Sequence, residues 1–188
     1  FWSGNCRKGA INIKESTITN AYICLNCNTI STQQFCKYNI DNFKSGKYRL
    51  DVDGTTKNIF KNYYYKHYES ILNTIKNIPK KYIYNKNILD FGSGNGQLLK
   101  ILQPLINIGV GIEIDKQFHF KNKNIINLSN FKKADKIVNK YDLIISSSVF
   151  GQLHDPQIIL AELSKRLKNN GLLIISDINS NDDLLKFG

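Results

Sequence analysis

The sequence has no methionine, even at position 1, so we expect a processed chain, a fragment or an incomplete list of residues. No apolar run approaches the ~18 residues that a membrane span needs. Residues 1–4 also lack the basic start and apolar stretch of a secretory leader. Four cysteines are few for a disulfide scaffold in a chain of 188 residues. These absences predict a reduced, cytoplasmic setting without a membrane span.

Arginine is also scarce, since Arg7, Arg49 and Arg166 are the only three among the 26 basic residues. The formal net charge of +11 suggests a nucleic-acid partner, but lysine, asparagine and isoleucine share A/T-rich codons. Residues 1–88 carry 14 basic and 5 acidic residues, whereas residues 89–188 carry 12 and 10. Genome composition therefore accounts for much of the charge. The 41% of hydrophobic residues excludes a disordered chain and allows one full domain with a small appendage.

The chain divides into three parts. Residues 1–50 hold all four cysteines and short β-like stretches, and residues 51–86 contain an amphipathic helix over 57–78 that ends at Pro79. Residues 87–188 alternate short apolar runs with helical stretches, which predicts βαβ units and a parallel sheet. Strands are expected at 87–91, 109–114, 124–128, 141–147 and 171–177, helices at 95–103, 131–139 and 156–168 with a short one near 116–121, and a left-handed turn at Gly171.

The strongest local signal is a glycine-rich turn between an expected strand and an expected helix. Gly92, Gly94 and Gly96 let the backbone turn sharply and let a ligand approach the main chain. The spacing is not that of a dinucleotide fingerprint or a P-loop. Glu113 ends the next strand, where a carboxylate can accept two ribose hydroxyls. The pair indicates a nucleoside cofactor, although any tight strand-to-helix corner also favours glycine.

Several segments resemble class I S-adenosylmethionine-dependent methyltransferases. Residues 88–96 (ILDFGSGNG) look like their first motif, residues 111–115 (GIEID) are similar to their second-strand motif, and residues 141–156 and 160–176 resemble the fourth strand and the closing helix–glycine–strand unit. The resemblance implies an α/β, Rossmann-like, doubly wound and mostly parallel sheet with helices on both faces. We expect it to follow a small cysteine-containing β-rich segment and to lack the family's C-terminal strands.

The resemblance also implies roles for individual residues. Asp90 would meet the amino group of the cofactor's methionine part, and Glu113 would hold the ribose. The family's adenine-contacting acid after the third strand has no clear counterpart, and the nearest polar residues are Asn127, Ser129 and Asn130. The full set expected to bind S-adenosyl-L-methionine is Asp90, Gly92, Ser93, Gly94, Asn95, Gly96, Glu113 and Ser146.

Two further residues are candidates for the chemistry. Methyl transfer needs a nucleophile in line with the sulfonium and often a base. Many relatives have a Glu-His pair after the fourth strand, where this chain has Gly151-Gln152 followed by His154. His154 is therefore a candidate base, although a surface histidine is the plainer interpretation. Tyr64 lies on the expected helix before the first strand and is a candidate for contact with cofactor or acceptor, or simply part of the helix core.

The cysteines have the spacing of an incomplete zinc ribbon. Cys24 and Cys27 form one knuckle, and Cys6 precedes them at a suitable distance. Ser3 stands where the ribbon's remaining thiolate is expected, so Cys36 is the alternative fourth ligand. A structural zinc on Cys6, Cys24, Cys27 and Cys36 competes with a metal-free remnant and with unrelated thiols.

The leading hypothesis is a methyltransferase acting on a small molecule, such as a sugar or another biosynthetic intermediate. An RNA methyltransferase using the basic N-terminal region is the alternative, which the shortage of arginine disfavours. A non-catalytic binding module that kept the fold is the third hypothesis, motivated by the departures at Ser3 and Gly151-Gln152.

Overall fold

The computed structural model describes residues 71–153 and 155–177 in full, the backbone of residues 2–7, 16–23 and 30–32, and residue 44. Strands β1 (Trp2–Arg7), β2 (Ser16–Ile23) and β3 (Ile30–Thr32) form an antiparallel sheet in the order β1-β2-β3. These strands agree with the β-rich character expected for the first part of the chain.

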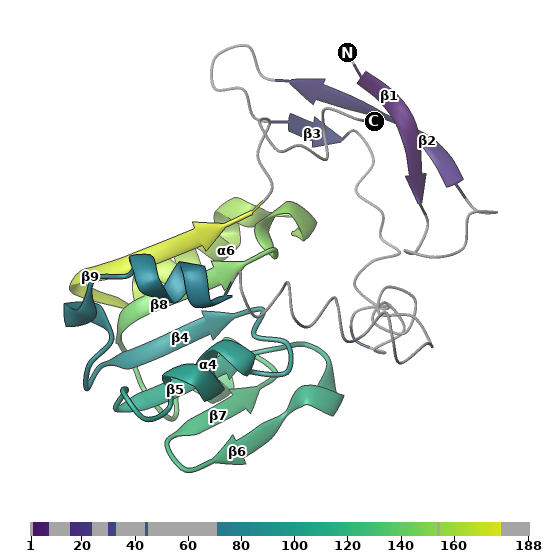
Figure 1. The fold of residues 1–188 in the computed structure, drawn as a ribbon. Helices are drawn as coiled ribbons and strands as arrows, with labels where there is room; N and C mark the ends of the chain where they lie inside the picture. The colour runs from purple at the N-terminus through teal and green to yellow at the C-terminus, as the bar shows by residue number, and fades with distance from the viewer. Residues whose placement is uncertain are drawn as a thin grey trace.

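A six-stranded sheet forms the main layer (Figure 1). Five strands run parallel, and only β6 is antiparallel to its neighbour β7. The spatial order is β6-β7-β5-β4-β8-β9, which confirms the predicted doubly wound, mostly parallel sheet. The strands are β4 (Asn87–Phe91), β5 (Ile108–Ile112), β6 (Phe120–Asn122), β7 (Ile125–Leu128), β8 (Tyr141–Ser147) and β9 (Leu167–Ser176).

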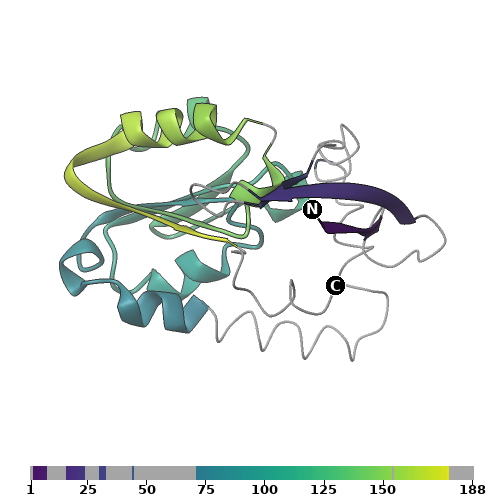
Figure 2. The same cartoon turned by 90° about the horizontal axis from the view of Figure 1, so that it is seen from above.

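Helices cover both faces of this sheet (Figure 2). The helix at 71–77 and α4 (Gln97–Leu102) lie on one face, where Ile88, Leu99 and Leu143 belong to a shared apolar cluster. The helices α5 (Phe131–Ala134) and α6 (Pro156–Arg166) lie on the other, where Leu89, Ile144 and Leu163 pack together. Alternate residues of β4 and β8 supply the two clusters, as the pleat of a strand requires. Short 3₁₀ turns occupy η2 (Lys80–Tyr82), η3 (Lys116–Phe118) and η4 (Phe150–Gln152).

The connection from β5 to β7 differs from the prediction. The expected helix near 116–121 is only the 3₁₀ turn η3, followed by the strand β6. Residues 113–124 are close to the minimum for joining two parallel strands, which leaves no room for a full crossover helix. The chain instead turns at Lys123, whose φ is 51°, and pairs antiparallel with β7.

Two other boundaries also differ. The helix expected over 131–139 ends at Ala134, and β9 begins at Leu167 rather than 171. The left-handed residue before β9's long pairing with β8 is Asn170, with φ 63°, and not Gly171. Asparagine tolerates this conformation better than most residues. Gly171 serves packing, because a Cβ there would lie 2.8 Å from the Leu167 side chain.

No helix among the described residues is both long and apolar enough to cross a membrane.

Candidate functional site

The glycine-rich turn lies where β4 ends and α4 begins, at the carboxyl edge of the parallel sheet (Figure 1). β5 lies on one side of β4 and β8 lies on the other, so the order of the strands reverses at β4. Ligands of open α/β sheets bind at such a switch point. The structure thus places the turn where the fold class predicts a binding site.

All three glycines of the turn have positive φ, at 77° for Gly92, 51° for Gly94 and 71° for Gly96. Two are also tightly packed. A Cβ at Gly92 would lie 2.1 Å from a methyl group of Val149, and one at Gly96 would lie 2.5 Å from the Phe120 ring. Glycine is therefore required here both by conformation and by space.

The Glu113 carboxylate holds this turn against the end of β5. Its Oε2 accepts a hydrogen bond from Gly94 N–H at 2.8 Å, and its Oε1 accepts one from Asp115 N–H at 3.0 Å. The residue is 8% exposed. A carboxylate can accept several hydrogen bonds at once, so the group has the chemistry to accept from a ligand's hydroxyls.

Asp90 on β4 is the register partner of Gly111 on β5, and it is 5% exposed. Burial, and secondly the charge of Glu113, raise the pKa of Asp90 to about 7. No cation among the described residues forms an ion pair with this carboxyl. Two neighbouring acids at the mouth of a glycine turn favour a ligand that is cationic and carries hydroxyl groups.

Ser93, Gly94 and Asn127 form a buried hydrogen-bonded cluster. Asn127 Nδ2 donates to the carbonyl oxygens of Gly94, at 2.8 Å, and Phe118, at 2.9 Å. Ser93 Oγ donates to Asn127 Oδ1 at 2.5 Å. The sequence offers Asn127 as an adenine contact, whereas the structure directs both ends of its amide into the protein. In the sequence, the one sign of this buried role is that Asn127 is a polar residue in an otherwise apolar strand.

Of the remaining residues expected at the cofactor, Asn95 lies in the glycine turn and Ser146 lies on the opposite face of the sheet from Asp90. Asn95 Oδ1 accepts from Gln97 N–H at 3.1 Å at the start of α4. Ser146 pairs in register with Phe91 and is 0% exposed, with no hydrogen-bond partner for its hydroxyl among the described residues. Since neighbouring residues of a strand alternate between faces, Ser146 lies on the α5–α6 face and Asp90 on the α4 face. Contact of Ser146 with a ligand stays a prediction.

The candidates for chemistry and metal binding lie largely outside the described residues. This applies to His154, Tyr64, Cys24, Cys27 and Cys36, while Cys6 lies in β1. Within the part of the chain that the structure describes, no three His, Cys, Asp or Glu side chains form a group that could hold a metal ion. Both the base and the zinc ligands stay predictions.

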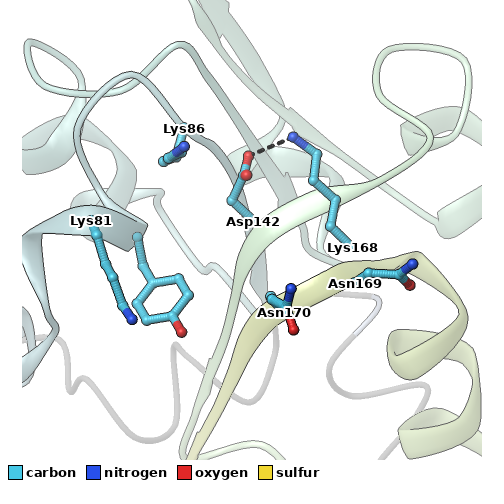
Figure 3. A pocket seen from close by; sticks show the side chains of 8 residues that line it. Lys81, Lys86, Asp142, Lys168, Asn169 and Asn170 are labelled. Atoms are coloured by element: carbon cyan, nitrogen blue, oxygen red, sulfur yellow. Dashed lines mark hydrogen bonds and ion pairs between the residues drawn. The ribbon is translucent and has the colours of Figure 1, made fainter.

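A separate pocket of about 300 Å³ opens at the opposite, amino edge of the sheet (Figure 3). Lys168 Nζ donates to Asp142 Oδ2 at 2.8 Å, and Asn87 N–H donates to the same oxygen at 3.0 Å. Burial alone would raise the pKa of Asp142, but these hydrogen bonds and the charges of Lys168 and Lys86 hold it below its usual value. The pocket contains none of the predicted site residues, and the ionised carboxylate of Asp142 is already paired with Lys168.

The sequence of this chain matches a known protein family. A family described as a methyltransferase domain matches residues 60–186. The chain belongs to this methyltransferase-domain family. It is 31% identical over 112 residues to the ubiquinone biosynthesis O-methyltransferase of Pelagibacter ubique (strain HTCC1062), covering 53% of this chain and 45% of that protein. The chain thus spans less than half the length of this curated relative.

Two solved structures are similar in fold. The plantazolicin methyltransferase BpumL, determined with a desmethylPZN analogue and SAH, has a TM-score of 0.54 at 21% identity, covering 72% of this chain and 58% of its own. The YcgJ protein of Bacillus subtilis has a TM-score of 0.52 at 18% identity, covering 63% and 55%. At these identities the two structures support the methyltransferase fold alone.

Proposed function

We propose that this protein transfers a methyl group from S-adenosyl-L-methionine to a small-molecule acceptor. One observation carries the proposal: the buried carboxylates of Asp90 and Glu113 flank a glycine turn at the switch point of a methyltransferase-family sheet. When bound, this cofactor supplies an electrophilic methyl group and leaves as S-adenosylhomocysteine.

The residues around the turn fit such a ligand. The carboxylate of Glu113 is a suitable acceptor for the two ribose hydroxyls, and it keeps Gly94 close to the floor of the site. Asp90 provides negative charge for the cofactor's ammonium group and sulfonium centre. The positive-φ glycines leave the main chain open to close approach. With an acceptor on the carboxyl side of β8, His154 would take the acceptor's proton and Tyr64 would line the site.

A small-molecule acceptor is favoured over RNA. The name of the curated relative indicates a hydroxyl acceptor on a biosynthetic intermediate, and we extend that class to this chain. Sugars remain in the same class. RNA is disfavoured because arginine is scarce and because the lysines of the basic N-terminal region share A/T-rich codons with asparagine and isoleucine. The small number of cysteines supports a reduced, cytoplasmic setting, and the spacing of the four cysteines supports a structural zinc.

Isothermal titration calorimetry with S-adenosylhomocysteine tests the cofactor assignment, using the whole chain. We expect saturable binding at one site. Glu113→Ala should weaken it by about 1–3 kcal/mol, because the ribose and Gly94 N–H both lose an acceptor. Lys168→Ala, in the pocket at the opposite edge, is the matched control and should bind normally. Unchanged affinity in Glu113→Ala would refute the assignment.

Transfer is tested separately with S-adenosylmethionine carrying a labelled methyl group. We expect label in hydroxyl-bearing small molecules and none in RNA. Binding of S-adenosylhomocysteine without transfer to any acceptor would support the non-catalytic module, whereas label in RNA with a steep salt dependence would support the alternative enzyme.

A further inference from the structure

The side chain of Asn127 joins two segments that the proposed cofactor must touch. Its Nδ2 donates to Gly94 O in the glycine turn and to Phe118 O in the segment after β5, at 2.8 and 2.9 Å. Asn127 is 1% exposed, so these bonds are made away from water. A buried amide that loses such partners is costly, which makes the arrangement specific.

The hydrogen bonds also determine which way the amide faces. Both neighbours of Nδ2 are carbonyl oxygens, which only accept, and the neighbour of Oδ1 is the Ser93 hydroxyl, which donates at 2.5 Å. Reversing the amide would put an acceptor against two acceptors. Both N–H groups of the amide are therefore used within the protein, and its oxygen already accepts from Ser93.

Gly111 makes this reach possible. In the sheet register it lies between Asn127 on β7 and Asp90 on β4. A Cβ at Gly111 would lie 2.0 Å from Asn127 Oδ1 and 2.6 Å from Ser93 Oγ. The bare backbone of β5 thus leaves the space in which the amide and the hydroxyl meet.

We infer that Asn127 is a positioning residue that sets the glycine turn for the cofactor, and not a contact to the adenine ring. This inference rests on the proposed cofactor. By holding Gly94 O, Asn127 also fixes the peptide whose N–H group binds Glu113 Oε2 at 2.8 Å. The turn is then held from two sides, by Asn127 and by Glu113.

Two substitutions separate the positioning role from an adenine contact. Asn127→Ala should weaken S-adenosylhomocysteine binding at least about fivefold, because Gly94 O and Ser93 Oγ lose their partner. Asn127→Asp should bind more weakly still at pH 8, since a carboxylate would face two carbonyl oxygens. Its affinity relative to wild type should recover in acid, where the carboxyl gains a proton to donate.

An adenine contact predicts the opposite signs. A carboxylate that accepts from the adenine amino group would let Asn127→Asp bind at least as well as wild type at pH 8 and lose affinity in acid. Each variant is compared with wild type at the same pH, because other titratable or charged groups surround the cluster in all of them. These are Asp90 on β4, Glu113, Asp115 and His119 after β5, Lys100 on α4 and Lys121 on β6.

Asn124 provides the matched control. It is an asparagine just before β7 whose Nδ2 donates to three carbonyl oxygens, of Gln103, Ile106 and Asn107, at the other edge of the sheet. Asn124→Ala should lower stability without changing S-adenosylhomocysteine affinity. If it weakens binding as much as Asn127→Ala does, the effect is general destabilisation and the inference is wrong.

A milder variant keeps the test open if Asn127→Ala does not fold. Ser93→Ala removes one hydroxyl and leaves the amide in place, so it should weaken binding less than Asn127→Ala. Where both fold, the double variant should bind no worse than Asn127→Ala, because the two side chains act through each other. Additive losses would overturn the coupling.

Amide hydrogen exchange gives a readout that needs no cofactor. Asn127→Ala or Ser93→Ala should speed exchange in residues 92–97 and 115–119, and Asn124→Ala should leave those segments unchanged. If exchange is faster in these variants but the wild-type protein does not bind S-adenosylhomocysteine, the proposed function is wrong and the positioning role stands. Unchanged exchange in the Asn127 and Ser93 variants would sink the positioning role even where the cofactor binds.

Discussion

Glu113 Oε2 accepts a hydrogen bond from Gly94 N–H at 2.8 Å, joining the end of the second parallel strand to the turn after the first. The burial of Asp90 is the main cause of its raised pKa, and the charge of the Glu113 carboxylate is the second cause. One side chain thus shapes the turn and sets the charge state of its neighbour.

Glu113→Gln should lower the pKa of Asp90 from about 7 toward its ordinary value. The substitution removes a negative charge and keeps the size of the side chain, while burial continues to raise the pKa. The carboxyl carbon of Asp90, followed by NMR against pH, measures the change. An Asp90 titration that is the same in both proteins would contradict the coupling of the two acids.

The stability of the protein should fall as pH rises from about 4 to 7. Asp90 has its unfolded pKa near 3.8 and its folded pKa near 7, so the folded protein binds the extra proton within this window. The stabilisation is complete below the unfolded pKa and lost through the folded pKa, by up to about 4 kcal/mol. Asp90→Asn should remove this dependence. The difference between the two proteins in urea unfolding at each pH isolates the Asp90 contribution.

S-adenosylmethionine should bind more tightly at pH 8 than at pH 6 and should release protons on binding near pH 7. The cationic cofactor favours the ionised form of Asp90, whose pKa lies near 7 without a ligand. Calorimetry in buffers of different ionisation enthalpy counts the protons. Asp90→Asn should bind with little proton release, and full release in that variant would assign the proton to another group.

Gly111→Ala should destabilise the protein by about 1–3 kcal/mol and weaken cofactor binding, because its Cβ would displace Asn127 and Ser93. Gly109→Ala on the same strand is the paired comparison. Its Cβ would meet Ile106 and Ile125 at 2.9 Å, within the apolar core. We expect Gly109→Ala to cost stability alone. Equal loss of affinity in both variants would indicate a general strand defect.

The glycine turn and its acidic partner were predictable from the sequence because their signal is local. Gly92, Gly94 and Gly96 lie in the turn directly after a buried strand, and Glu113 directly follows the next strand. The role of Asn127 was not predictable, because it depends on the register that places Gly111 beside it. The sequence shows where the strands occur along the chain, but not which side chains share the space beside Gly111.

The errors in the elements have a similar origin. Residues 116–121 have the composition of a short helix. Their structure is decided instead by the small number of residues that connect β5 to β7 and by the pairing of β6 with β7. At the start of β9, glycine suggests the left-handed residue, whereas Asn170 takes that conformation and Gly171 accommodates Leu167. Local propensity is overridden in both places by tertiary packing.

The two asparagines of the β7 region bind carbonyl groups at opposite edges of the sheet, Asn124 at the amino edge and Asn127 at the carboxyl edge. A four-residue strand with this arrangement cannot slide along β5, because a shift in register would break both sets of hydrogen bonds at once. Insertions or deletions between β5 and β7 are therefore constrained from both ends of β7, and also by the antiparallel pairing of β6 with β7.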